Sequence, residues 1–314
     1  MKYTFLLPAY KVKFLENALN SIINQTYGDF KVIVSDDCSP EKIKAIVDKF
    51  SDERISYRRN SCNIGMKNLV SHWNLLLDLC DTEYFILASD DDVYEKNFLE
   101  EINKLVEKYP EIDLIHARAR IINENNEVCE EDSIYEEYVS QIKFLTQYEY
   151  YNHIECIANY VFKTKALKNA GGFVEFPLAW NSDTATTALL AKNGVANTKD
   201  ILFNFRMSGY NISSLNKDNK SITKKKYQAM LCYDNFMDKF FGNMETCKSL
   251  LLDNEKKKIM GLNKKRIINA TCYYSSSLSL YDFLKFLKLF KKKRYINNID
   301  IYVLFKKWMY ETFS

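Results

Sequence analysis

The first 122 residues alternate between short apolar runs and segments whose apolar residues recur at helical spacing. The runs suit buried strands, and in the intervening segments apolar residues three and four positions apart form one helix face. Strands that alternate with helices are joined by right-handed crossovers and form a mostly parallel sheet. We therefore predict a doubly wound α/β fold, with strands at residues 3–7, 30–34, 54–59, 84–88 and 112–122 and helices at residues 14–23, 40–50, 69–80 and 98–106.

The alternation ends after about residue 125. From about residue 222 the chain contains two glycines and no proline, which favours helices. We predict two domains, an α/β domain at residues 1–215 and a helical C-terminal region at residues 216–314. Within the first domain we also predict an acidic loop or flap at residues 124–137, a strand at residues 154–162 and a helix at residues 182–192 that Gly194 caps.

Composition and charge exclude some classes of protein and of binding partner. Hydrophobic residues make up 47% and charged residues 27% of the 314 residues, a globular balance, and the net charge of +3 is too small to indicate a nucleic-acid partner. The eight cysteines form no C-x-x-C pair, which predicts buried thiols in a reducing compartment. The first apolar run is too short for a signal peptide, and no run approaches the ~18 apolar residues of a spanning helix. We therefore expect a cytoplasmic protein.

Acidic clusters directly follow two of the predicted strands. Asp90, Asp91 and Asp92 follow the strand that ends at residue 88. Oxygen ligands suit Mg²⁺ and Mn²⁺, which often keep phosphate oxygens in their coordination shell, so this acidic turn (residues 90–92) is a candidate metal–diphosphate site. The alternative is a solvated loop or a helix N-cap. Asp36 and Asp37 follow another strand, where one carboxylate can cap the next helix and the other can bind a nucleotide.

Three further positions are candidates, because ligands of such sheets bind beyond the carboxyl ends of the strands. Asn63 and Gly65 belong to a small polar turn where the backbone can approach a ligand, although an ordinary turn is the alternative. Asp183 begins a predicted helix and is either its N-cap or a base.

Histidine and glycine patterns disfavour other classes of enzyme. The three histidines are far apart, which disfavours a zinc site and a Ser-His-Asp hydrolase. We predict that His72 and His116 are packed or capping residues, and His153 directly precedes the strand predicted at residues 154–162, which we expect on the acceptor side. The sequence has no G-x-G-x-x-G or Walker loop, which disfavours nicotinamide and P-loop enzymes.

The order and spacing of several short motifs resemble the family 2 glycosyltransferases, which have the GT-A fold. The resemblance covers about residues 1–215 and is strongest in the first half. The motifs are Pro8-Ala9-Tyr10, Gln25-Thr26-Tyr27, Val34-Ser35-Asp36-Asp37-Cys38-Ser39, Asn63-Ile64-Gly65, Ala88-Ser89-Asp90-Asp91-Asp92, Gly172-Phe173 and Asp183.

The resemblance implies a site for a nucleotide-sugar donor, expected to be a UDP-sugar. Tyr10 would flank the nucleotide base beside the backbone of Pro8 and Ala9, and Asp37 would accept a hydrogen bond from the base. The turn that contains Asn63 and Gly65 would adjoin this base site.

The acidic turn would bind the diphosphate end of the donor through Mn²⁺ or Mg²⁺. By the resemblance, Asp90 would contact the ribose or the metal, and Asp92, with Asp91, would bind the metal. Arg206 lies where the family often has a basic residue near the diphosphate. Gly209 and Tyr210 stand where a histidine commonly follows, which weakens the expected clamp on the diphosphate.

Asp183 falls where the family places its catalytic base, often in a Glu-Asp pair, and here Ser182 replaces the glutamate. It would deprotonate an acceptor hydroxyl in one inverting displacement. The expected acceptor is a saccharide or a lipid-linked saccharide, as in the family members that build bacterial surface polysaccharides. The alternatives are a non-catalytic nucleotide-sugar-binding or membrane scaffold protein and a sugar nucleotidyltransferase, although the latter usually has a Gly-rich loop where this chain has Pro8-Ala9-Tyr10-Lys11.

Basic and aromatic residues are concentrated at the C-terminal end. Residues 281–314 contain eight Lys/Arg and three Asp/Glu, a net charge of +5 (eight minus three). A basic helix with large aromatic residues suits an anionic membrane surface, so we predict peripheral contact with the inner face of the cell membrane. The alternative is a helix packed on the catalytic domain. The apolar positions at helical spacing are Phe283, Phe286, Leu287 and Phe290.

Overall fold

The computed structural model divides the chain into two compact units, Met1–Ser208 and Gly209–Ser314, which are described separately. The domain boundary predicted at residues 215–216 lies outside the described residues, as do Gly209 and Tyr210. The structure describes residues 1–146, 153–208, 220–243, 254–255, 257–258, 261, 279–292 and 296–313.

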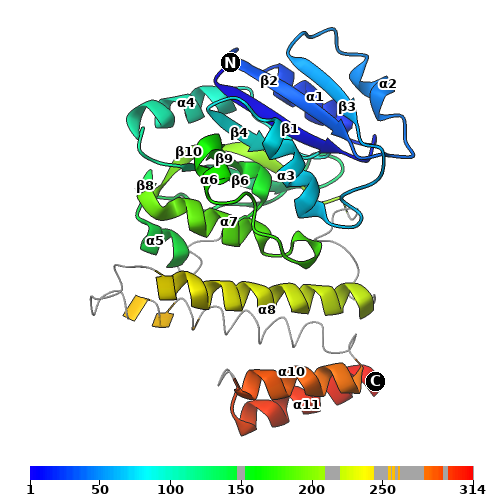
Figure 1. Cartoon of the computed structure of the whole chain (residues 1–314), viewed down its shortest axis with the longest axis vertical. Coiled ribbons are helices and arrows are strands. Elements are labelled where there is room, and N and C mark those ends of the chain that lie inside the picture. Colours follow the sequence, from blue (N-terminus) through cyan, green and yellow to red (C-terminus); the bar gives the residue numbers. More distant parts are fainter. Residues whose placement is uncertain are drawn as a thin grey trace. The chain divides into compact units, whose positions relative to one another are not determined.

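The first unit is built on one mixed sheet, which has ten strands among the described residues (Figure 1). Along its main path the strand order is β3-β2-β1-β4-β9-β6-β10-β5, with β7 paired to β6 and β8 to β10. The strands are β1 (Tyr3–Ala9), β2 (Phe30–Asp36), β3 (Ile55–Arg59), β4 (Tyr84–Leu87), β5 (Val93–Tyr94), β6 (Leu114–Ile122), β7 (Val128–Glu131), β8 (Tyr138–Val139), β9 (Tyr160–Lys163) and β10 (Val195–Arg206).

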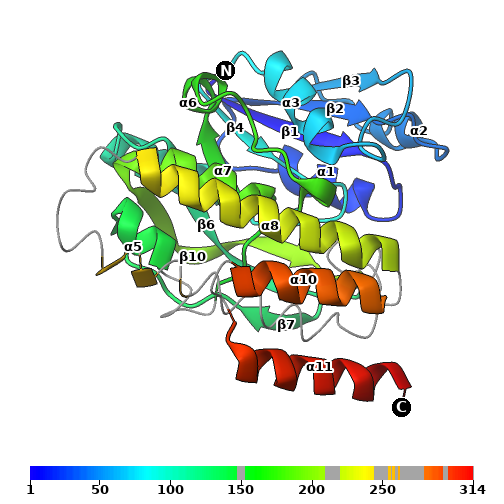
Figure 2. The same ribbon diagram turned by 60° about the horizontal axis from the view of Figure 1, so that its bottom comes forward.

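Six strands of this sheet run in the same direction. β1 pairs in parallel with β2 and β4, β2 with β3, and β6 with β10. β9 is antiparallel to both β4 and β6, so β4 and β6 also run the same way. Figure 2 shows β6 and β10 side by side in the same half of the sheet. The predicted α/β fold with a mostly parallel sheet is confirmed.

Successive residues of a strand point to opposite faces of the sheet. Both faces carry apolar side chains here, and helices cover both of them. Tyr84 and Ile86 belong to the main core with apolar residues of α1 (Leu15–Ile23), α2 (Ile43–Val47) and α4 (Phe98–Lys108). Phe85 points the other way and packs against Phe162 and Phe173, and Phe173 also contacts Trp73. Trp73 belongs to α3 (Leu69–Leu79), and the remaining helical segments of this unit are α5 (Gln141–Thr146), η2 (Ile157–Asn159), α6 (Thr164–Asn169), η3 (Pro177–Ala179), α7 (Ser182–Leu190) and η4 (Ala191–Asn193).

The second unit contains three long helices in its described part, α8 (Lys220–Asn243), α10 (Leu280–Lys292) and α11 (Asn298–Phe313). The aromatic stripe of α10 is used for packing within this unit. The ring of Phe286 stacks on Tyr227 of α8 at 4.4 Å, and that of Phe283 stacks on Trp308 of α11 at 5.4 Å. No helix in the described stretches is long and apolar enough to span a membrane.

Most differences from the sequence prediction are in the second half of the first unit. Residues 124–137 contain β7 in addition to loop, and the strand expected at residues 154–162 is shorter, at Tyr160–Lys163. Strand β10, the longest in the sheet, was not predicted. Gly194, with φ 86°, ends the helical segment as expected.

The cysteine prediction is partly wrong. Cys80 is buried, but Cys62, Cys129 and Cys232 are exposed. The six cysteines in the described part of the chain are free thiols, and Cys247 and Cys272 lie outside it.

Candidate active site

The predicted site residues follow strands that end at one edge of the sheet. Tyr10 follows β1, Asp37 follows β2 and the acidic turn follows β4. Because these strands are parallel, their carboxyl ends lie at the same edge, which is where α/β sheets bind ligands. Arg206 is the last residue of β10 and reaches this edge as well.

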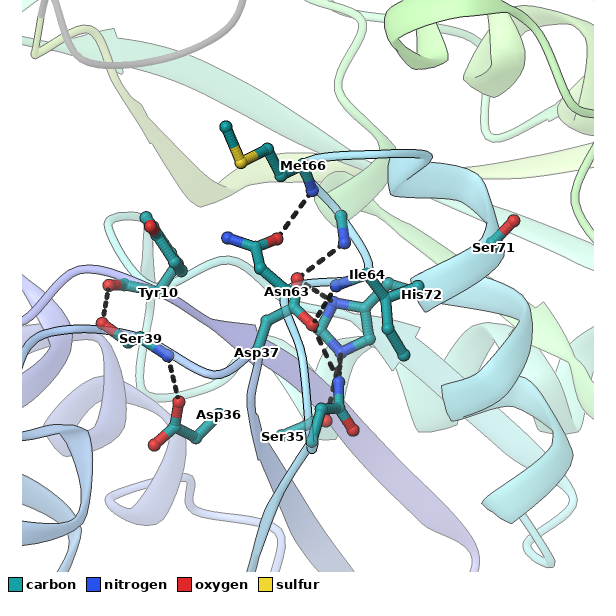
Figure 3. A network of polar contacts seen from close by, with 12 residues as sticks. Tyr10, Ser35, Asp36, Asp37, Ser39, Asn63, Ile64, Met66, Ser71 and His72 are labelled. Atoms are coloured by element: carbon teal, nitrogen blue, oxygen red, sulfur yellow. Dashed lines mark hydrogen bonds and ion pairs between the residues drawn. The ribbon is translucent and has the colours of Figure 1, made fainter.

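Asp37 lies in a cradle of hydrogen-bond donors (Figure 3). Its Oδ1 accepts from the Asn60 side chain and from the Ile64 N–H, both at 2.9 Å, and its Oδ2 accepts from the Gly65 N–H at 2.7 Å. The turn between β3 and α3 therefore wraps around this carboxylate. Asn63 stabilises the same turn by accepting from the Met66 N–H at 2.7 Å.

His72 lies beside Asp37 and is buried. Its Nδ1 is 3.6 Å from Asp37 Oδ2, and its Nε2 is 3.1 Å from Ser35 Oγ and 3.3 Å from Asn60 Nδ2. Burial lowers the pKa of His72, and the nearby Asp37 carboxylate offsets only part of that effect. The imidazole is therefore neutral and supports Asp37, and its burial agrees with the prediction that His72 is a packed residue.

Asp36, the neighbour of Asp37, has a structural role. It accepts from the Ser39 N–H at 2.8 Å and the Tyr57 hydroxyl at 2.7 Å, and it pairs with Arg59. These contacts fix the turn after β2, in which Cys38 has a left-handed φ of 55°. Strained backbone of this kind often marks functional sites.

The end of β1 links Asp37 to the acidic turn. The backbone N–H groups of Tyr10 and Lys11 both donate to Asp90 Oδ2 at 2.8 Å. The Ala9 carbonyl accepts from the Asp37 N–H at 3.0 Å. Pro8 lies one residue earlier in β1, and the Tyr10 side chain is 39% exposed, so its ring is accessible to a ligand.

Asp92 and Arg206 anchor the acidic turn. Asp92 is buried, and it accepts from the Arg206 N–H at 2.8 Å and from the Ser89 hydroxyl at 2.8 Å. The buried Arg206 side chain donates to the carbonyl groups of Asp91 at 2.8 Å and Asn123 at 3.0 Å. Its guanidinium therefore contacts protein carbonyls in this structure, and the predicted diphosphate contact stays a prediction.

The acidic turn carries buried negative charge. Burial raises the pKa of Asp90 to about 6, raises that of Asp91, and raises that of Asp92 well above its ordinary value, where repulsion from Asp91 adds to the effect. Among the described residues, no three acidic, histidine or cysteine side chains converge as a ready ligand set. The oxygen donors nevertheless fit a divalent cation, since a cation would relieve the cost of this charge.

Asp183 lies in the first turn of α7 and is half-buried. Its Oδ1 accepts from the Thr184 N–H at 2.8 Å. The preceding loop is strained, with left-handed φ values at Leu178, Ala179 and Asn181. Burial raises the pKa of the Cys156 thiol, and repulsion from the carboxylates of Asp92, Asp183 and Asp91 adds to this rise. Asp183, Asp91 and Asp92 therefore all lie near this thiol.

Sequence reasoning missed several residues of this region. Asn60 and His72 support Asp37, Ser89 supports the acidic turn, and Thr184 and Glu155 lie beside Asp183. Ser89 was within a recognised motif and Thr184 follows Asp183 in the chain, but Asn60, His72 and Glu155 reach the site only through the fold. Their residue types carry no sequence signal that distinguishes them from ordinary polar residues.

Comparison with known proteins shows two uncharacterized relatives of this chain. An uncharacterized glycosyltransferase of Haemophilus influenzae is 23% identical over 326 residues, covering 92% of this chain and 94% of that relative. An uncharacterized glycosyltransferase of Methanocaldococcus jannaschii is 28% identical over 159 residues, and the match spans 50% of this chain and 53% of the archaeal protein.

Two solved structures share the fold. TarS 1-349 of S. aureus, in complex with UDP-GlcNAc, has a TM-score of 0.57 and 18% identity, covering 88% of this chain and 84% of that one. The mannosyltransferase PcManGT of Pyrobaculum calidifontis, in complex with GDP-Man and Mn²⁺, has a TM-score of 0.54 and 13% identity, covering 99% and 85%. The family model described as Glycosyl transferase family 2 matches residues 4–170, more than half of the 314 residues, and the chain therefore belongs to the family 2 glycosyltransferases with the GT-A fold.

Proposed function

We propose that this enzyme transfers a sugar from a nucleoside-diphosphate donor to an acceptor hydroxyl, with inversion at the anomeric carbon. The observations that support the proposal best are that Asp37 and the acidic turn follow neighbouring parallel strands, and that Asp92 and Asp183 both lie near the Cys156 thiol, whose pKa they raise after the larger effect of burial. TarS and PcManGT, which share the fold, were solved with UDP-GlcNAc and with GDP-Man, which are both nucleoside-diphosphate sugars.

On the donor side, Asp37 would accept a hydrogen bond from the ring N–H of the base. Its carboxylate is held in place by the Asn60 side chain and by the Ile64 and Gly65 N–H groups, which leaves one of its four lone-pair sites, on Oδ2, with a fixed direction. Uracil and guanine both carry a ring N–H that fits such an acceptor, whereas cytosine has none. Uracil is our first choice, and the accessible ring of Tyr10 would lie against it.

The diphosphate would lie beside the acidic turn, with Asp90 toward the ribose and Asp91 and Asp92 toward a divalent cation. Mn²⁺ or Mg²⁺ bound there would supply a Lewis acid that neutralises charge on the departing diphosphate. Asp91 is half-buried, whereas Asp92 is buried and its Oδ1 accepts from the Arg206 N–H; the Ser89 hydroxyl lies 2.5 Å from Asp91 Oδ1 and 2.8 Å from Asp92 Oδ2 and donates to one of them at a time. Asp91 is therefore the residue to test first as a ligand.

On the acceptor side, Asp183 would act as the general base. It takes the proton of the acceptor hydroxyl while that oxygen bonds to the anomeric carbon and the bond from that carbon to the diphosphate oxygen breaks. One displacement needs one base, unlike hydrolysis by a pair of carboxylates that flank the bond. General-base catalysis contributes roughly 10²–10⁴-fold to the rate.

The test is a donor screen with Mn²⁺ or Mg²⁺ that measures release of the nucleoside diphosphate with and without saccharide acceptors. Asp183→Asn should bind the donor with unchanged affinity and lose at least about 100-fold in transfer. Intact transfer by this variant would remove Asp183 from the role of base. Donor binding without transfer or hydrolysis by the wild type would instead favour a non-catalytic binding protein.

A separate proposal concerns membrane contact through the second unit. The predicted aromatic residues Phe283 and Phe286 are buried, so they cannot form the contact in this structure. The opposite face of α10 exposes Tyr281 and Leu284, at 74% and 47% of their surface. It also carries four exposed lysines, Lys285, Lys288, Lys291 and Lys292, which suit an anionic surface.

A further inference from the structure

A second carboxylate lies beside Asp183 and comes from a distant part of the sequence. Glu155 precedes the short helix η2, whereas Asp183 and Thr184 are in the first turn of α7. The Thr184 hydroxyl donates to Glu155 Oε2 at 3.0 Å, and the same hydroxyl oxygen is 3.4 Å from Asp183 Oδ1. One side chain therefore lies between two carboxylates.

These two carboxylates compete for a single proton donor. A threonine hydroxyl has one hydrogen, so it donates to one acceptor at a time. The shorter distance gives this hydrogen to Glu155, and the buried position of Thr184, with 6% of its surface exposed, restricts alternative partners. Asp183 keeps its backbone contact with the Thr184 N–H at 2.8 Å but receives at most a weak bond from the hydroxyl.

This competition bears on the strength of the base. A hydrogen bond donated to a carboxylate stabilises its charged form and makes it a weaker base, and a helix N-terminus acts in the same direction. Asp183 already lies in the first turn of α7. A like charge nearby has the opposite effect, because it disfavours the charged form.

We propose that Glu155 is a positioning residue of the acceptor site, which withholds the Thr184 hydroxyl from Asp183 and so keeps that carboxylate basic. The proposal rests on the proposed role of Asp183 as general base. Glu155, from the segment before η2, places a carboxylate near Asp183, whose neighbour in the chain is Ser182 instead of a glutamate.

Other titratable groups face this pair from neighbouring elements. Cys156 follows Glu155 in the chain, Tyr160 begins β9, and Asp91 and Asp92 follow β4. Glu155 and Asp183 both raise the pKa of the buried Tyr160 phenol, after the larger effect of burial, so both carboxylates lie near this ring. The Thr184 hydroxyl contacts both Glu155 and Asp183, and this contact joins the two carboxylates.

The test is a double-mutant cycle on transfer rates under saturating donor, with melting temperature measured for every variant. Glu155→Ala should lower kcat about tenfold with little change in the KM for donor, and shift the acidic limb of the pH–rate profile to lower pH. Glu155→Gln should keep most of the activity, because its amide oxygen can accept the same hydrogen bond. In the Thr184→Val background, Glu155→Ala should cost no more than about twofold, because the hydroxyl that would bind Asp183 is gone.

The outcomes separate this inference from the proposed function. Equal losses from Glu155→Ala with and without the Thr184 hydroxyl would show that Glu155 does not act through Thr184, and would overturn the inference. Wild-type kcat in Glu155→Ala would overturn it as well, even if Asp183→Asn is inactive. Full transfer by Asp183→Asn would instead overturn the proposed base itself.

Discussion

Substitution of Gly65 by alanine tests the proposed contact between Asp37 and the nucleotide base, because the added methyl group would collide with Asp37. A Cβ atom on Gly65 would lie 2.9 Å from Asp37 Oδ2 and 3.3 Å from a methyl carbon of Leu69. The Gly65 N–H donates to the same carboxylate oxygen at 2.7 Å. Gly65→Ala therefore forces the carboxylate to move, although Asn60 and Ile64 hold its other oxygen, each at 2.9 Å.

The expected effect is on the affinity for the nucleotide. If Asp37 accepts a hydrogen bond from the base, a displaced carboxylate loses that bond. Hydrogen bonds to charged groups contribute about 1.5–3 kcal/mol, and about 1.4 kcal/mol corresponds to a tenfold change in affinity. Gly65→Ala should therefore weaken the binding of UDP roughly 10- to 100-fold.

Isothermal titration with UDP in the presence of Mn²⁺ measures this change directly. Gly28→Ala is the matched control, because a Cβ atom on Gly28 meets no other atom within 4 Å. Thermal unfolding of both variants separates a local change at the site from loss of the fold. A folded Gly65→Ala protein that binds UDP within about twofold of the wild type would refute the role of Asp37 as base acceptor.

Three other predictions test the acidic turn, the core and the second unit. If the folded acidic turn binds Mn²⁺, the metal should raise the melting temperature of the wild type, and Asp91→Asn should lose most of this rise; an equal rise in both proteins would exclude Asp91 as a ligand. Burial lowers the pKa of His116 to about 3. As the pH falls below 6.5, this histidine becomes protonated in the unfolded chain but stays neutral in the folded chain, which favours unfolding. Lowering the pH from 7 to 5 should therefore reduce the free energy of unfolding by about 2 kcal/mol. His116→Gln should remove that part of the pH dependence in urea denaturation, whereas an unchanged slope would contradict the assignment. Tyr281→Ser combined with Leu284→Ser should reduce pelleting with anionic liposomes and leave neutral liposomes unaffected; equal pelleting of variant and wild type would count against the exposed face of α10.

The first half of the fold could be predicted because its strands carry the signal in their own residues. In β1 and β4 nearly every side chain is buried, so each appears in the sequence as a continuous apolar run. Strand β10 could not be predicted this way, because it buries polar residues. Asn197 is 3.2 Å from His116 Nδ1, and Asn204 donates to Glu95 at 3.0 Å, so partners distant in sequence make these residues acceptable in a strand.

The membrane prediction shows a different limit of sequence patterns. Helical spacing correctly placed Phe283 and Phe286 on one face of α10. The same spacing describes a face that packs against protein and a face that binds a membrane, since both are apolar stripes. Only the contacts of these rings with Trp308 and Tyr227 decide between the two for this stripe.

The acidic side chains of the site share a property that no residue pattern can reveal. Asp37, Asp90, Asp92 and Asp183 each accept a hydrogen bond from a main-chain N–H, in most cases one contributed by a distant segment. Every residue except proline has such a donor, so its position depends only on the path of the chain. Carboxylates held by main-chain N–H groups keep one orientation without help from flexible cationic side chains. Little reorganisation is therefore needed when a ligand binds to them. The sequence can therefore indicate candidate carboxylates, whereas the direction in which each one points depends on the main chain that the fold brings beside it.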